Sequence, residues 1–458
     1  MDSDGSREGY FHLNKRFKPD TDQTILNVDN LDSSGESSTE QSLFTEADWS
    51  RLPYLVLVQV FQHLDQTDRY HAALTCKSWL LALSSPAVWR TGHFKLNTKY
   101  DKYLLIFIRR MGKSFLHIRA DGTAQTDRGI RYSIRFLYHF IEALLTANNQ
   151  QLVTLSLTDM KILELSSVHH KWEVVEQLAI LIENQRNLQV LNLSHADLSI
   201  DEGFRLLEAA ASHRCHKTIH TLDIDRLIDY TQAGDFSTDK KFYHYMSRFS
   251  NLSDLELSQL YLSDELLYQL AETASFSLRL ITIREEYVRL NRRQTTSTAW
   301  QYLKSACPNC KVETFINPRI GRLFDFSVRE ILTPSMPLHT LNWNCGRTAD
   351  TDTFQLCMQH IADNFQDSLR HLHIFFWDVP DKKSLLDLIK RCHNLETLSV
   401  RTSNLTSGLE RRIETDIKLG LACHHSSTHP CVATLNHKDV SLKDTWQTTI
   451  FCWLAKLV

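Results

Sequence analysis

The chain has 458 residues, of which 42% are hydrophobic and 23% charged, and its formal net charge at pH 7 is −3. This composition is ordinary for a soluble globular protein of two or three domains, and it gives no reason to expect nucleic acid or a membrane as a partner. Ten cysteines in a chain of this class favour a reduced compartment over a disulfide scaffold, so we expect the cytoplasm, the nucleus or both.

Residues 1–45 form a segment rich in Ser, Asp, Glu, Thr and Gln, with few large apolar residues. Such a segment buries too little apolar surface to offset the entropy of folding, so we predict a disordered tail. The basic residues between Asn14 and Lys18 would be a weak nuclear-import signal or, more simply, part of that solvated tail.

The next segment, 46–92, contains a helix that is more apolar than its surroundings can cover. Between Leu52 and Leu64 the apolar side chains fall on all sides of a helix, and a helix that is apolar all round must be buried all round. Only about 25 residues follow before the segment ends, which is too small a unit to bury them. Each large apolar side chain left in water costs about 1.5–3 kcal/mol, so we infer that a second protein covers part of this helix.

These residues resemble the F-box, the motif by which substrate receptors bind the adaptor of SCF (cullin–RING) ubiquitin ligases. The residues that match the pattern are Leu52, Pro53, Val56, Leu57, Val60, Phe61, Leu64, Cys76, Trp79 and Trp89. The resemblance implies a three-helix domain in which these ten residues bind the adaptor. Tyr54 and Leu55 replace the usual acidic pair, which removes polar adaptor contacts and keeps the hydrophobic ones. The alternative is an ordinary three-helix cap on a larger domain.

A repeated strand pattern follows a helical linker at 93–150, in which we predict a degenerate strand near 115–118 and a helix near 134–145. The pattern is L-x-x-L-x-L, the signature of a leucine-rich-repeat strand. Its copies start at Leu152, Leu188, Ile219, Leu252, Leu278, Val312 (a weak copy), Leu338, Leu369 and Leu395. Starts lie roughly 26 to 36 residues apart, which leaves room for one strand and one helix per repeat.

One repeat cannot bury its own apolar face, so stacked neighbours supply the core. We therefore predict an α/β fold, in which an N-terminal three-helix F-box precedes a curved leucine-rich-repeat solenoid at 151–406 with its strands on the concave side.

An F-box followed by such repeats is similar to the substrate receptors of SCF ligases, and in particular to F-box-only proteins with degenerate repeats. The resemblance implies that the F-box binds the adaptor, and through it the cullin and RING subunits, while the solenoid binds an unknown protein substrate. It also implies a chain without catalytic residues or cofactors. Two alternatives are a structural adaptor that docks without ubiquitin transfer, and a chain whose altered C-terminus cannot retain substrate.

Residues that alternate with the repeat leucines point away from the core, because successive strand side chains face opposite ways. Four of these on neighbouring repeats are Asp223, Asp225, Asp254 and Glu256. We predict that they form an acidic patch for a Lys/Arg-rich substrate segment. Further outward candidates are Arg284, His373, Phe375 and Trp377, of which the two aromatic residues would anchor an apolar side chain. The alternative is a solvated polar face, with Trp377 packed in a loop.

Two cysteine groups have spacings that occur at metal sites. Cys307 and Cys310 lack a second pair at matching distance, so we interpret them as structural. Cys423, His424, His425, His429 and Cys431 are close enough in sequence to bind zinc, although the loop is tight and we do not predict a metal site. No phosphate-binding or hydrolase motif is present.

At 407–458 we predict a helix near 409–419 and an apolar tail that either caps the last repeat or remains disordered.

Overall fold

The structure, a computed structural model, describes residues 49–96, 102–122, 127–161, 168–212, 215–285, 295–317, 328–329, 331–344, 351–376, 381–402 and 432–437. The predicted N-terminal tail, Trp377, the helix near 409–419 and the cysteine–histidine group at 423–431 lie outside these residues. In the part of the chain that is described, no helix combines the length and apolar character that crossing a bilayer requires.

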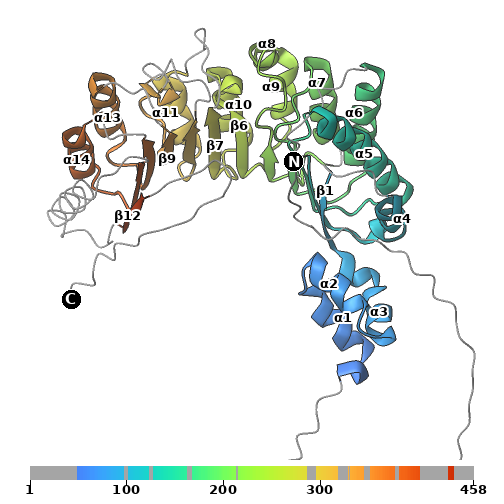
Figure 1. Ribbon diagram of the computed structural model, residues 1–458. Helices are drawn as coiled ribbons and strands as arrows, with labels where there is room; N and C mark the ends of the chain where they lie inside the picture. Colours follow the sequence, from blue (N-terminus) through green and yellow to red (C-terminus); the bar gives the residue numbers. More distant parts are fainter. Residues whose placement is uncertain are drawn as a thin grey trace, which may run out of the picture. The chain divides into compact units, whose positions relative to one another are not determined.

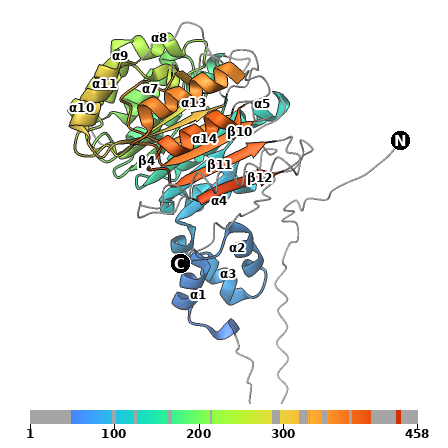
Figure 2. The same cartoon turned by 90° about the vertical axis from the view of Figure 1, so that its left-hand side faces the viewer.

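The first unit consists of short helices that close around a small apolar core. Its elements are η1 (Trp49–Arg51), α1 (Tyr54–Gln62), α2 (Gln66–Ala73), α3 (Lys77–Leu83) and η2 (Pro86–Trp89). Figure 2 shows α1, α2 and α3 grouped together. Asp65 is the N-cap of α2, because its carboxylate accepts a hydrogen bond from the Asp68 amide at 2.7 Å. The connection between α1 and α2 therefore ends at Asp65. The polar residues that follow Asp65 form the first turn of α2.

The core of this unit lies between α1 and the elements that follow it. Its buried apolar residues are Leu57, Val58, Phe61, Ala72, Ala82, Leu83 and Val88. The rings of Phe61 and Trp79 meet edge to face, with their centroids 5.3 Å apart.

The rest of the described chain forms one parallel sheet of twelve strands in sequence order. The strands are β1 (Thr91–Lys95), β2 (His117–Asp121), β3 (Thr154–Thr158), β4 (Val190–Asn192), β5 (Thr221–Asp223), β6 (Asp254–Ser258), β7 (Leu280–Glu285), β8 (Lys311–Ile316), β9 (Leu338–Asn344), β10 (His371–Phe376), β11 (Thr397–Thr402) and β12 (Val432–His437). Every predicted repeat strand is thus a strand. The sheet also contains β1 and β12, which the leucine pattern does not predict.

Helices connect these strands and cover one face of the sheet (Figure 1). They are α4 (Lys102–Met111), α5 (Asp127–Thr146), α6 (Val168–Glu183), α7 (Ile200–Ala210), α8 (Ala233–Thr238), α9 (Lys240–Met246), α10 (Asp264–Thr273), α11 (Ser297–Ala306), α13 (Thr351–Phe365) and α14 (Lys382–Arg391), together with the short turns η3 (Gly112–Ser114) and η5 (Gln259–Tyr261). A helical segment is described in each connection from β1 to β8 and from β9 to β11, which confirms the predicted α/β repeat architecture.

Repeat leucines point into the layer between strands and helices. Leu155 and Leu191 are register partners on β3 and β4, and both are fully buried. Buried amides tie the repeats together as well, since Asn149 donates to the carbonyls of Gly112 and Phe115, and Gln185 donates to that of Asn149. Hydrogen bonds of this kind satisfy polar groups that are buried between neighbouring repeats.

A recurring backbone turn ends three neighbouring strands. Asp159, His195 and Arg226 each follow a strand of β3, β4 or β5 at the same register position, and their φ angles are 55°, 56° and 50°. Residues other than glycine rarely adopt this left-handed conformation. It turns the chain from the strand toward the connection and brings three charged side chains to one end of the sheet.

Candidate functional site

The first unit leaves large apolar side chains exposed, as its sequence predicts. Leu55 is 72% exposed and Val60 is 45% exposed, while Val56 lies one turn from Val60 on the same face of α1. From α1 to α3 the exposed large apolar residues are Tyr54, Leu55, Val56, Val60, Leu74, Leu80 and Leu81. This surface is the candidate docking surface of the unit.

The residues predicted to bind the adaptor fall into three groups in the structure. Pro53, Val56 and Val60 are exposed. The partly buried positions are Leu52, Leu64, Cys76, Trp79 and Trp89. Leu57 and Phe61 are only 2% and 1% exposed, so in this structure they hold α1 onto its own core and present no surface.

Trp89 lies at the junction of the first unit and the repeats. Its indole Nε1 donates to the Leu83 carbonyl at 2.7 Å, and the Arg69 guanidinium lies 5.3 Å from the ring centroid. On its other side the ring meets Phe107 of α4 edge to face, with a centroid distance of 4.8 Å. These contacts make Trp89 a residue that joins two apolar clusters.

Leu74, Leu80 and Leu81 are exposed residues outside the matched motif positions, and Leu55, which is exposed as well, stands where the motif has an acidic residue. The signal that would find Leu80 and Leu81 is present in the chain, since α3 reads KSWLLAL and is apolar on several sides, as α1 is.

The predicted acidic patch is corrected by the structure, because two of its four carboxylates are buried. Asp223 is 8% exposed and Asp225 only 1%. Asn192 donates a 2.7 Å hydrogen bond to Asp223, and the Asp225 amide donates to the other oxygen of the same carboxylate at 3.0 Å. Burial, together with the nearby Glu256 carboxylate, raises the pKa of Asp223 to about 7.

The other two carboxylates are partly exposed and already have partners. Glu256 forms an ion pair with Arg284 from the neighbouring strand, and Asp254 accepts a hydrogen bond from the Ser253 hydroxyl. Arg284 also lies over the ring of Phe315, 4.6 Å from its centroid. The four carboxylates are therefore not an open negative surface. Their alternation in sequence predicts exposure, but His195 in the turn after β4 lies against Asp225, and Arg284 on β7 pairs with Glu256.

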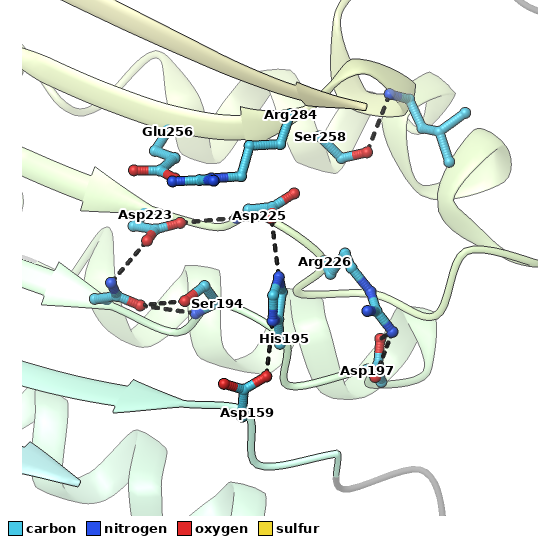
Figure 3. Close-up of polar contacts among 12 residues, drawn as sticks. Asp159, Ser194, His195, Asp197, Asp223, Asp225, Arg226, Glu256, Ser258 and Arg284 are labelled. Atoms are coloured by element: carbon cyan, nitrogen blue, oxygen red, sulfur yellow. Dashed lines mark hydrogen bonds and ion pairs between the residues drawn. The ribbon is translucent and has the colours of Figure 1, made fainter. Parts of the chain in front are cut away.

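His195 is the centre of this polar network (Figure 3). Its Nδ1 lies 2.8 Å from Asp159 and its Nε2 lies 3.1 Å from Asp225, so the ring bridges three repeats. Hydrogen bonds to both carboxylates raise the pKa of His195 to about 10. Next to it, Arg226 binds both oxygens of Asp197 at 2.8 Å. The network can hold the connections of these repeats in one arrangement.

Further along the sheet, the remaining predicted residues are spread over β7 and β10. His373 is partly buried, and its register partners on β9 and β11 are Asn342 and Ser399. Phe375 is on the border of exposure, and Trp377 lies outside the described residues. The structure thus places Phe375 on the strand face, while its role as an anchor stays a prediction.

Cys307 and Cys310 are both buried where α11 ends and β8 begins. Burial raises the pKa of the Cys310 thiol to about 12, so this thiol is protonated at neutral pH. The structural interpretation of the pair fits this position.

Residues 49–95 match the family model of the F-box-like domain. Over 276 residues the chain is 22% identical to F-box/LRR-repeat protein 21 of Mus musculus, and equally to that of Ovis aries, in alignments that cover 58% of this chain and 59% of each relative. It is 36% identical to F-box/LRR-repeat protein 21 of Bos taurus over 56 residues, 12% of this chain and 13% of the relative. The chain therefore spans about 59% of the length of the first two relatives. These findings confirm the predicted resemblance to F-box proteins with leucine-rich repeats.

Proposed function

We propose that this chain, in which an F-box-like domain precedes leucine-rich repeats, is a substrate-recognition subunit of an SCF ubiquitin ligase. In this proposal the F-box-like domain binds the adaptor, which connects the chain to cullin and RING subunits. The repeats bind a protein substrate. Ubiquitin transfer is carried out by the other subunits, and the chain contributes by raising the effective concentration of substrate near the ubiquitin-charged enzyme.

The observation that carries the proposal is the exposed apolar surface of the F-box-like domain. A domain this small buries Leu57, Val58 and Phe61 in its own core and leaves Leu55, Val56 and Val60 in contact with solvent. Exposed clusters of large apolar side chains are typical of protein interaction sites. A protein surface that covered them would recover about 25 cal/mol for each Å² of apolar area removed from water.

Support for the substrate side comes from the repeats. In the described residues the helices cover one face of the sheet (Figure 1). Burial alternates along the strands, so the less buried, polar side chains lie on the other face. A long parallel sheet with one uncovered face offers an extended surface for a protein partner.

The test is adaptor capture by the full chain in cells, with Val60→Asp compared with the matched variant Leu356→Asp. Both residues are apolar and similarly exposed, at 45% and 49%, but Leu356 lies on α13 of the repeats. We expect Val60→Asp to lose the adaptor, because a carboxylate would have to be desolvated in the interface. Leu356→Asp should retain the adaptor, cullin and RING subunits.

Retention of the adaptor by Val60→Asp would contradict the proposed docking surface. The predicted alternative, a scaffold without ubiquitin transfer, is separated from the proposal by a second measurement. If the adaptor is captured but cullin and RING subunits are absent, and no partner protein accumulates when the proteasome is inhibited, the scaffold function is favoured.

A further inference from the structure

A groove of about 630 Å³ lies on the strand face at the first four strands. Residues of β1 to β4 line it, among them His93, Lys95, Arg119, Asp121, Ser156 and Thr158. We call it the β1–β4 groove. Within it β3 presents the short side chains of Ser156 and Thr158, whereas β1 and β2 present the longer His93 and Arg119.

One row of polar side chains crosses the groove. His93, Arg119, Ser156 and Asn192 are successive register partners on β1, β2, β3 and β4. Neighbouring strands are about 4.8 Å apart, so the row is roughly 14 Å long. An extended peptide that follows the row would place about four residues over it.

Most of the donors in the groove are not used within the described part of the chain. The side chains of His93, Arg119, Ser156 and Thr158 have no hydrogen bond or ion pair with any described residue. Asn192 differs, because it donates to Asp223 and accepts from Ser194. A groove with unused donors is ready to bind acceptor groups of a partner.

The charges in the groove favour an acidic partner. Asp121 is the one carboxylate among the lining residues, and its register partner is the cationic Lys95. The guanidinium of Arg119 therefore remains as an uncompensated positive charge among the lining residues. Arginine binds carboxylates through paired hydrogen bonds. The neighbouring carboxylates that the sequence assigned to a basic partner are already engaged by Asn192, His195 and Arg284.

We infer that the β1–β4 groove binds an extended, carboxylate-rich segment of a partner protein, with Arg119 binding a carboxylate and Ser156 and Thr158 donating hydrogen bonds beside it. This inference rests on the proposed function in one respect: it takes the partner protein to be the substrate. The expected segment is negatively charged, whereas the acidic patch predicted from the sequence would bind a positively charged one.

The experiment uses the full chain mixed with the adaptor and a fluorescent Ser-Glu repeat peptide, and binding of the peptide is followed by fluorescence anisotropy. Alternating Glu residues of an extended peptide all face one side. Ser-Gln, Ser-Lys and phosphoserine-Gln repeat peptides are the comparators. The variants are Arg119→Glu and the matched Arg279→Glu, an exposed arginine outside the groove lining.

We expect the Ser-Glu peptide to bind best to the unmodified chain. Arg119→Glu should weaken that binding by about tenfold or more, because a charge-assisted hydrogen bond is lost and a like charge replaces it. Arg279→Glu should bind as the unmodified chain does.

Three results would overturn the inference: no binding of the Ser-Glu peptide, equal binding to Arg119→Glu, or preference for the Ser-Lys or the phosphoserine peptide. Adaptor capture is scored in the same samples. Adaptor capture without binding of the Ser-Glu peptide would contradict the inferred role of the β1–β4 groove and leave the proposed function intact. Binding of the Ser-Glu peptide without adaptor capture would contradict the proposed function and leave the inferred role of the groove intact.

Discussion

At the scale of single residues, the most constrained group is His195. Two carboxylates from neighbouring repeats bind its two ring nitrogens, and only 22% of its side chain is exposed. The hydrogen bonds favour the imidazolium form strongly enough to outweigh its burial. His195 therefore carries a positive charge at neutral pH and offsets the negative charge of Asp159 and the buried Asp225.

Replacing this histidine by glutamine should destabilise the repeats by about 2–3 kcal/mol near pH 6, because two charge-assisted hydrogen bonds are lost. The pKa of His195 is about 10 in the fold and near 6.5 in the unfolded chain. Its stabilising contribution is therefore complete below about pH 6.5 and is lost as the pH rises toward 10. Urea denaturation of His195→Gln and of the unmodified chain at several pH values measures this difference.

The control is His220→Gln, because His220 is also partly buried but contacts Thr221 and Gln189 instead of carboxylates. A destabilisation by His195→Gln that did not shrink between pH 6.5 and 10 would show that His195 is not the charged centre of the network.

At the scale of helices and strands, side chains at helix starts connect one repeat to the next. Thr296 immediately precedes α11 and caps it, because its hydroxyl oxygen accepts a hydrogen bond from the Ala299 amide at 3.2 Å. Its hydroxyl and its amide both donate to Asp264, which lies in the first turn of α10. One residue thus caps its own helix and links it to the helix of the preceding repeat.

Thr296→Ala should cost about 1 kcal/mol, the usual effect of removing a helix cap. Thr298→Ala is the matched control, since Thr298 is exposed in the first turn of the same helix and provides no cap. We expect the control to be within about 0.5 kcal/mol of the unmodified chain. Thermal denaturation measures both, and an equal effect of the two substitutions would contradict the linking role of Thr296.

At the scale of the whole molecule, the buried apolar residues form two separate clusters. One lies within the F-box-like domain and the other runs through the repeats from Phe94 to Leu398. Trp89 contacts both, and the Arg90 carbonyl accepts hydrogen bonds from the amides of Leu116 and His117. We expect the two clusters to unfold as separate units, because among the residues that the structure describes Trp89 is the one that packs against both.

Trp89→Ala should destabilise the F-box-like domain by about 3 kcal/mol, the lower end of the range for truncating a large core aromatic residue. Hydrogen exchange followed by mass spectrometry should show faster exchange in α1, α2 and α3 and unchanged exchange in strands β5 to β10. Trp172→Ala is the control, since Trp172 is an exposed tryptophan on α6. Faster exchange throughout the repeats would instead mean that the clusters unfold together.

Much of the fold follows from local patterns. Leucines that alternate along short segments predict the strands β3 to β11, because only one face of such a strand can be buried. The F-box motif and the excess of apolar residues in α1 likewise predict a small helical domain with an exposed apolar surface. By contrast, β1 was missed because Thr91–Lys95 contains only one large apolar residue, Phe94, and becomes a strand through its pairing with β2.

The candidate sites depended on contacts that local patterns do not contain. Alternation predicts an outward face for Asp223 and Asp225, yet Asn192 at the end of β4 and His195 in the turn after it, both of the preceding repeat, lie against them. The division of α1 into buried Leu57 and Phe61 and exposed Val56 and Val60 likewise depends on where α2 and α3 pack. Sequence alone thus determined the elements and their inward faces, because these depend on side chains two to four positions apart. Tertiary structure decided which outward groups stay available to a partner, because their neighbours come from other repeats.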